Sequence, residues 1–269
     1  MRGASRASYA ELRDQLGAVA VGPATAEQIG DQLFAVVRLL DSEHGLRRAL
    51  ADSGKPAAEK TAVARRLMHD RVSEATEGLV ADAAAGHWAN SSDFADALEQ
   101  LAIEALTLSA QFGGTLDDLE DDLFRFNRVI AGQPGLRSAL IGPTGPDAKA
   151  SLLANLLSNK VSGPSLSLLT QVLTHPRGRS PQAVLDLAAG IAARRREQLI
   201  AVVRAATELT VAQRQRLFDT LTAAYGQGIH LNVVHDPAVI GGVSVQIGDE
   251  LVDGTAASRL AAVRRKLAG

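Results

Sequence analysis

The sequence predicts a mainly α-helical protein in which two tandem bundles of the six-helix type precede a small α/β module. Three observations indicate this fold class: a segment recurs 90 residues further on, apolar residues in both copies follow helical spacing, and short β-branched runs replace that spacing after about residue 196. The expected domains are therefore residues 1–102, 103–195 and 196–269.

The repeat is clearest in the segments 33–50 and 123–140, LFAVVRLLDSEHGLRRAL and LFRFNRVIAGQPGLRSAL. Eight of their 18 aligned positions are identical, whereas unrelated segments would share roughly one. The offset of 90 continues more loosely through the pairs Pro56/Pro146, Ala58/Ala148, Ala64/Ala154, Leu67/Leu157, Phe94/Val184 and Leu101/Ile191. A unit of about 90 residues has therefore been duplicated.

Both copies contain a strongly amphipathic helix, because their apolar residues recur at three- and four-residue steps. These residues are Ile29, Leu33, Val36, Val37 and Leu40 in the first copy and Leu116, Leu119, Leu123, Phe126 and Ile130 in the second. The acidic run 117–122 near the start of the second helix is interpreted as compensation of the helix dipole rather than as a cation site. Gly45 and Gly135 are expected to end the two helices in a left-handed cap.

The C-terminal part reads as strand, helix, strand and then a hairpin. Strands are expected at 199–206 and 230–234, with a helix at 210–226 between them that has Thr210 as its N-cap. An alternating strand, a tight turn, a return strand and a final helix follow. The residues that predict them are Val243, Val245 and Ile247, then Gly248 and Asp249, then Leu251, and finally Leu260, Val263 and Leu267.

The composition excludes several classes of protein. No cysteine is present, which excludes disulfides, thiolate metal sites and cysteine nucleophiles. A net charge of −2 and an aromatic content of 3% offer little to a phosphate backbone or to stacked bases, so no nucleic-acid partner is expected. No apolar run is long enough to span a bilayer, and residues 11–14 interrupt any secretory signal with charge. We expect a soluble folded chain.

No motif indicates catalysis. The stretch 241–248 contains the best candidate for a phosphate cradle, but it lacks the lysine and Ser/Thr of a P-loop and lies inside the predicted hairpin. The six histidines are scattered, and Ser244 lacks the second glycine of a nucleophile elbow. We therefore expect no catalytic, cofactor-binding or metal-binding residues. The basic triplets 194–196 and 264–266 are either solvated helix ends or contacts to an acidic partner helix.

The end of the chain resembles the δ subunit of F-type ATP synthases, which is called OSCP in mitochondria. The resemblance lies in an Asp-x-x-apolar-apolar-Gly-Gly motif, a strand that ends in Ile-Gly-Asp, an Asp-Gly-Thr motif and a leucine-bearing tail. The matching residues are Asp236, Ile240, Gly241, Gly242, Gly248, Asp249, Asp253, Gly254, Arg259 and Leu260. Residues 103–195 are similar to the family's helical domain, so the first copy is additional, as in the δ portion of actinobacterial enzymes.

The resemblance implies a non-catalytic stator subunit without cofactors. In that family the helical domain holds N-terminal helices of the α subunits in the α/β catalytic head, and the C-terminal module binds the b subunit of the peripheral stalk. The resemblance also implies a peripheral position on the cytoplasmic face of the bacterial plasma membrane, through the complex alone. Because no membrane-anchored segment precedes Met1, b is expected to be a separate chain.

Helix capture would use an apolar face of a bundle. The first candidates for partner binding are Leu116, Leu119, Leu123 and Phe126, with ordinary core packing as the alternative. Two other functions remain open at this point. A helical-repeat adaptor of another complex would explain the duplication but not the C-terminal motifs, and an enzyme that binds phosphate at 241–248 would require an ordered anion there.

Overall fold

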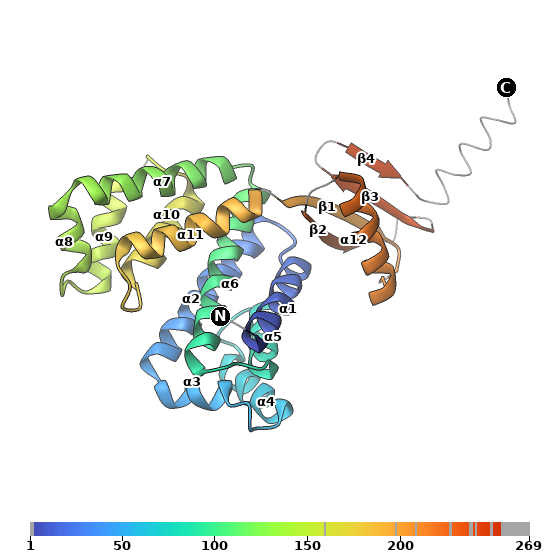
Figure 1. Cartoon of the computed structure of the whole chain (residues 1–269), viewed down its shortest axis with the longest axis horizontal. Helices are drawn as coiled ribbons and strands as arrows, with labels where there is room; N and C mark the ends of the chain where they lie inside the picture. Colours follow the sequence, from blue (N-terminus) through green and yellow to red (C-terminus); the bar gives the residue numbers. More distant parts are fainter. Residues whose placement is uncertain are drawn as a thin grey trace, which may run out of the picture. The chain divides into compact units, whose positions relative to one another are not determined.

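The computed structural model describes residues 3–158, 160–196, 198–207, 209–225, 228–236, 239, 241–247 and 250–253 (Figure 1). The chain divides into two compact units, Met1–Arg195 and Arg196–Gly269, which we call the helical unit and the C-terminal unit. The mainly α-helical class is confirmed, with a small sheet confined to the C-terminal unit.

The helical unit consists of α1 to α11. Their bounds are α1 (Ala4–Val19), α2 (Pro23–Ser42), α3 (His44–Ala51), α4 (Ala57–Met68), α5 (Glu74–Ala85), α6 (Ser91–Phe112), α7 (Leu116–Gly132), α8 (Pro134–Ile141), α9 (Pro146–Leu157), α10 (Gly163–Thr174) and α11 (Pro181–Arg196). The predicted caps at Gly45 and Gly135 are wrong, because both glycines lie inside the short helices α3 and α8. The preceding helices end three residues earlier, at Ser42 and Gly132.

The duplication is visible in the helices themselves. The bounds of α3 and α8 are 90 residues apart at both ends, and those of α4 and α9, and of α5 and α10, are 89 apart. The offset changes because the loop before α9, residues 142–145, is one residue shorter than the loop before α4, residues 52–56. The helices of the two copies therefore correspond one to one.

The shift of one residue corrects part of the sequence alignment. On α4 the buried residues are Lys60, Ala64 and Met68, and 89 residues later Lys149, Leu153 and Leu157 are buried on α9. The predicted pairs Ala64/Ala154 and Leu67/Leu157 are therefore out of register, and Ala154 is exposed. A match of alanine to alanine carries little information in an alanine-rich chain, whereas the burial pattern identifies the equivalent positions.

A capping contact occurs in both copies and ties the second helix to the fifth. In the first copy Gln32 Oε1 accepts hydrogen bonds from the backbone N–H and the hydroxyl of Ser73, the N-cap of α5, at 3.0 and 2.8 Å. In the second copy Asp122, 90 residues after Gln32, accepts from the backbone N–H of Ser162, the N-cap of α10, at 3.3 Å. The same two helices are thus held by equivalent residues.

The expected boundary at 102/103 falls in the middle of α6. This helix matches α1 at an offset of 90 through buried Leu16 and Leu106, and it matches α11 through Leu101 and Ile191. Helix α6 is the last helix of the first copy and the first helix of the second. The two copies therefore share a helix and form one unit. Helices α2 and α3 of the first copy and α7 and α10 of the second all pack on it.

A charged contact also joins the copies. The Arg177 guanidinium, in the loop between α10 and α11, donates to Asp41 on α2 at 2.7 Å, to Asp96 on α6 at 2.7 Å and to Glu99 on α6 at 2.9 Å. Glu99 is only 2% exposed and also pairs with Arg179. The second copy therefore supplies the positive charge that the buried carboxylate of α6 requires.

The C-terminal unit is a four-stranded sheet with one described helix, α12 (Val211–Tyr225). The strands β1 (Gln198–Ala205), β2 (Gly228–His235), β3 (Val243–Ile247) and β4 (Glu250–Asp253) lie in the order β2-β1-β3-β4. Strand β1 pairs with β2 in parallel and with β3 antiparallel, and β4 pairs antiparallel with β3. The predicted order of strand, helix, strand and hairpin is confirmed for these residues.

Alternating apolar residues of the sheet face α12. Together with Leu221 of α12 they form the core of the C-terminal unit, which consists of Ala201, Val203, Leu221, Ile229, Val245 and Ile247. The predicted N-cap of α12 is also confirmed, because the Thr210 hydroxyl accepts from the N–H of Gln213 at 3.3 Å and the Gln213 side chain accepts from the N–H of Thr210. The predicted turn at Gly248 and Asp249 and the final helix at 260–267 lie outside the described residues.

Gly30 on α2 permits the close approach of α2 and α6. A Cβ atom at this position would lie 2.8 Å from the Leu106 side chain and 3.2 Å from the carbonyl oxygen of Ala102. We expect Gly30→Val to lower the free energy of unfolding by about 1–3 kcal/mol because it overpacks this contact. Urea unfolding followed by far-UV circular dichroism measures the change. The control is Gly78→Ala on α5, which meets no atom within 4 Å and should stabilise by about 0.5–1 kcal/mol.

Removing the Arg177 charge tests the contact between the copies. We expect Arg177→Gln to cost about 2–4 kcal/mol, because buried Glu99 keeps only Arg179 as its partner. The control is Arg125→Gln, which breaks an exposed i,i+4 pair with Asp121 at 3.1 Å and should cost less than about 0.5 kcal/mol. Equal losses in the two variants, measured by the same urea titration, would contradict the assigned role.

Candidate functional site

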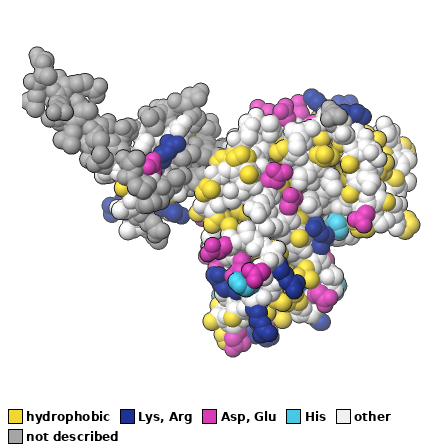
Figure 2. Space-filling model, turned by 180° about the vertical axis from the view of Figure 1, so that it is seen from behind, with side chains coloured by type: hydrophobic (Ala, Val, Ile, Leu, Met, Phe, Trp, Pro, Cys, Tyr) yellow, Lys and Arg dark blue, Asp and Glu magenta, His cyan; other side chains and the backbone are white. Residues whose placement is uncertain are grey.

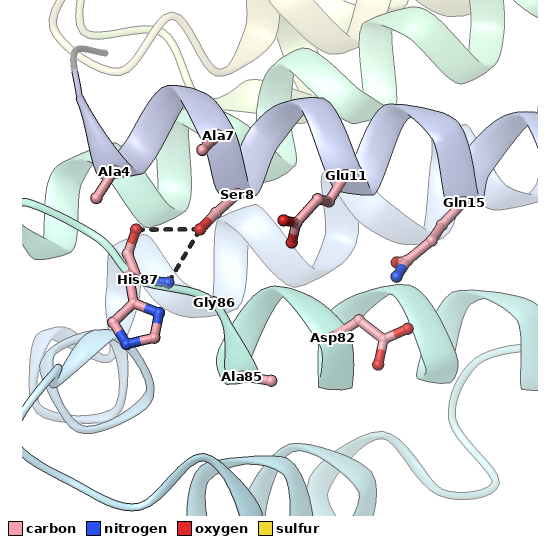
Figure 3. A pocket seen from close by; sticks show the side chains of 9 residues that line it. All are labelled: Ala4, Ala7, Ser8, Glu11, Gln15, Asp82, Ala85, Gly86 and His87. Atoms are coloured by element: carbon pink, nitrogen blue, oxygen red, sulfur yellow. Dashed lines mark hydrogen bonds between the residues drawn. The ribbon is translucent and has the colours of Figure 1, made fainter. Parts of the chain in front are cut away.

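A hollow of about 410 Å³ opens on the surface between α1 and α5 (Figure 3). We call it the α1/α5 groove. Its sides carry the small residues Ala4, Ala7 and Ala85 and the polar residues Glu11, Gln15 and Asp82. Figure 3 shows Glu11 and Gln15 pointing from α1 toward α5.

Hydrogen bonds to two buried serines fix one end of the groove. Ser8 Oγ accepts from the N–H of His87 at 3.0 Å and lies 3.2 Å from the carbonyl oxygen of the same residue. Ser5 Oγ accepts from the N–H of Ala89 at 2.9 Å. These bonds tie α1 to the segment that follows α5. The close packing here also requires Gly86, since a Cβ atom on it would lie 3.1 Å from Ser8.

The opposite face of α1 is anchored by a buried carboxylate. Glu104 on α6 is 3% exposed, accepts a hydrogen bond from the Tyr9 hydroxyl at 2.8 Å and pairs with Arg13 at 2.7 Å. Arg195 at the end of α11 lies 3.6 Å from the same carboxylate. The pKa of Tyr9 lies well above its ordinary value. Burial is the largest cause, and the negative charge of Glu104 is the next. Tyr9 therefore stays a neutral donor, and α1 is held rigidly as one wall of the groove.

The residues that line the groove are suited to contact with a helix. Alanines allow close backbone approach, and the exposed carboxylates of Glu11 and Asp82 attract a cationic side chain. Gln15 Oε1 is buried and accepts no hydrogen bond from any described residue. The sequence analysis did not identify this site. The only signal in the sequence was the helical spacing of four residues that are buried on one face of α1. Two of them are polar and two are apolar: Ser5, Ser8, Leu12 and Leu16.

The residues predicted to bind a partner are buried in the second copy. Leu116, Leu119, Leu123 and Phe126 are at most 9% exposed, which favours the packing alternative over direct docking. The same helix carries an exposed aromatic residue instead. Phe124 is 63% exposed, and the Arg128 guanidinium lies 5.9 Å from the centre of its ring.

The described residues of the C-terminal motif shape the backbone. The Asp236 N–H donates to the Ala205 carbonyl at 2.9 Å, which joins the end of β2 to β1. Gly241 and Gly242 have φ of 64° and 88°, in the left-handed region that favours glycine. Asp253 ends β4 opposite Ser244. The turn geometry therefore accounts for the glycine pair, which sequence analysis had also considered as a phosphate cradle. Ile240, Gly248, Asp249, Gly254, Arg259 and Leu260 lie outside the described residues.

Among the described residues, no group of three or more His, Asp or Glu side chains could hold a metal ion. None of the described helices combines the length and the apolar character that a membrane span requires. On the face seen in Figure 2, charged side chains of both signs are dispersed over the helical unit.

Comparison with known proteins gave consistent results. The family model of the ATP synthase delta (OSCP) subunit matches residues 91–267. The chain is 43% identical to ATP synthase subunit delta of Thermobifida fusca, with all of both chains covered. It is 41% identical to the subunit of the same name in Acidothermus cellulolyticus, again over all of both chains. It is also 42% identical to that of Kineococcus radiotolerans, over 99% of this chain and 98% of that one.

The family model begins at the start of α6, and the relatives extend the similarity through the first copy to the N-terminus. The chain therefore belongs to the ATP synthase delta (OSCP) subunit family.

Proposed function

We propose that this chain joins the α/β catalytic head of an F-type ATP synthase to the b subunit of its peripheral stalk. The chain is a non-catalytic stator subunit of that complex, as its family membership indicates. The helical unit would contact N-terminal helices of the α subunits, and the C-terminal unit would contact b. The observation that carries the proposal is the similarity to delta subunits over the whole chain, first copy included.

The proposed task is to resist torque. Rotation of the central shaft exerts a counter-torque on the head, and a head without a tether would turn with the shaft and uncouple proton flow from ATP synthesis. A static joint of this kind needs buried area and several anchoring side chains rather than a reactive group. A rigid helical unit with an open groove, followed by a separate sheet-containing unit, offers two such anchoring bodies.

The proposed location follows from the proposed partners. A subunit that binds the head and b would lie at the cytoplasmic face of the bacterial plasma membrane and would associate with the membrane only through the complex. A helical-repeat adaptor of another complex is not favoured, because the C-terminal motifs and the full-length relatives both indicate the delta family.

Truncation tests the division of labour between the two units. Deleting residues 236–269 removes β3 and β4 and uncovers β1, so a chain that ends after Arg196 is the cleaner variant. We expect this variant to keep its helical circular dichroism and to co-purify with α and β. Its affinity for b should fall at least about 10-fold, because the whole stalk-binding body is missing.

The full chain is the control for this experiment and should bring down α, β and b together. An unfolded truncated chain would contradict the division into units, and undiminished b binding would contradict the assignment of b to the C-terminal unit. A full chain that captures neither the head nor b would contradict the stator proposal itself.

A further inference from the structure

We propose that an exposed face of α7 binds an amphipathic helix of the b subunit that presents a glutamine or asparagine side chain. We call this surface the α7 face and define it by Asp121, Phe124 and Arg128. The inference rests on the proposed function, which supplies b as a partner of the chain. It adds a second contact for b, on the helical unit, and the chemistry that this contact recognises.

The residues of the α7 face recur unchanged on α2 of the first copy. At the offset of 90 they correspond to Asp31, Phe34 and Arg38. In both helices they follow the spacing i, i+3 and i+7, which places them within about 60° of one another around the helix axis. The two copies therefore carry the same three side chains on one face of the same helix.

In the first copy this surface is occupied by α10 of the second copy. Asp31 accepts from the Ser167 hydroxyl at 3.1 Å and from the amide nitrogen of Gln171 at 3.2 Å. Arg38 donates to the amide oxygen of Gln171 at 2.8 Å. Phe34 is only 4% exposed. The surface thus holds one amide side chain between an acidic and a basic residue, beside a buried aromatic ring.

No described element covers the same surface in the second copy. Figure 1 shows α7 at the upper edge of the helical unit, and Phe124 is 63% exposed. Asp121 pairs with Arg125 at 3.1 Å, with their side chains 68% and 70% exposed. An exposed i,i+4 pair of this kind contributes little free energy, so Asp121 can exchange it for a partner's donor. Burial of the Phe124 ring would favour the contact.

The acidic and basic residues define the side chain that the α7 face recognises. A carboxylate in the place of Gln171 would pair with Arg128 but repel Asp121, and a cationic side chain would do the reverse. An amide supplies both a donor and an acceptor, so Gln or Asn satisfies both residues. The occupant should also carry Ser or Thr four residues earlier, as α10 does with Ser167.

The contact at the α7 face should be weaker than the contact between α2 and α10. Of the three carboxylates that hold Arg177, only Asp96 has an acidic counterpart 90 residues later, Asp186. Ala131 and Ala189 replace the other two. The occupant therefore needs no equivalent of Arg177, and its affinity depends on the amide and the aromatic ring.

A second copy of this chain fits the α7 face poorly. In that copy α10 is already covered by its own α2. The equivalent helix, α5, carries Gly78 and Asp82 in place of Ser167 and Gln171. Gly78 offers no hydroxyl, and Asp82 would bring a carboxylate to Asp121, which costs affinity.

The chain connection from α7 to the C-terminal unit supports b as the source of the helix. Asn127 on α7 donates to Asp186 on α11 at 2.8 Å, and α11 runs directly into the C-terminal unit at Arg196. A b subunit bound to that unit is thereby tethered to the α7 face. The second contact then forms at a high effective concentration, so a weak contact suffices.

Photo-crosslinking in the assembled enzyme tests the occupant. The photoreactive residue p-benzoylphenylalanine replaces Phe124 in the full chain, and in a control it replaces Ile141, which is 60% exposed on α8. Position 124 should crosslink to b, at a segment that carries Gln or Asn with Ser or Thr four residues earlier. Position 141 should not crosslink to b. A crosslink from position 124 to the head, to a second copy of the chain or to no protein would overturn the inference, as would a crosslink to b from both positions.

The affinity of the full chain for purified b tests the side chains. We expect Phe124→Ala and Arg128→Gln each to weaken b binding at least about 5-fold, because they remove the buried ring and the donor to the amide oxygen. The matched controls are Ile141→Ala and Arg125→Gln, which change an exposed apolar residue and an exposed arginine outside the α7 face. Neither control should weaken binding, and circular dichroism should show that all four variants are folded.

Unaltered b binding by Phe124→Ala and Arg128→Gln, or an equal loss in the controls, would overturn the inference. These outcomes leave the stator proposal standing, because the unaltered chain still binds b through its C-terminal unit. An unaltered chain that fails to bind b at all contradicts the stator proposal instead.

Discussion

The burial of α6 is the constraint on which the helical unit depends. Apart from Gln100, every residue of the segment 97–110 is buried, including the carboxylates Glu99 and Glu104. These two side chains are five residues apart, which places them about 140° from each other around the helix axis. A buried charge must be paired, so Glu99 requires Arg177 and Arg179, whereas Glu104 requires Arg13 and Tyr9. The two carboxylates thus fix which segments lie on opposite sides of α6.

The sequence predicted the fold class, the duplication and most of the C-terminal unit, because these leave periodic signals in apolar residues. It did not predict that the copies share α6. A helix buried on all sides has no polar face, so its periodicity does not indicate which copy it serves. The identical pair Phe34 and Phe124 shows the same difficulty. Phe34 is 4% exposed and Phe124 is 63% exposed, because exposure depends on which other elements cover each copy.

The candidate site was less predictable than the fold. An amphipathic stripe marks the side of a helix that packs against the rest of its own domain. Leu116, Leu119 and Leu123 form such a stripe, and the remainder of the second copy buries it. The groove is lined by alanines and exposed polar residues, which in a sequence look like any solvated surface. Its position depends on how α1 and α5 pack together, which no periodic pattern in the sequence indicates.

The shared helix has a mechanical consequence. Two domains joined by a linker transmit a pull through the linker, and the compliance of the pair is that of its softest segment. In this chain 22 residues of continuous helix run through both copies, a rod of about 33 Å. Tyr9 and Arg13 attach α1 to this helix at Glu104, and Arg177 attaches the second copy to it at Glu99. Because the two copies share α6, the duplication has added no linker between them.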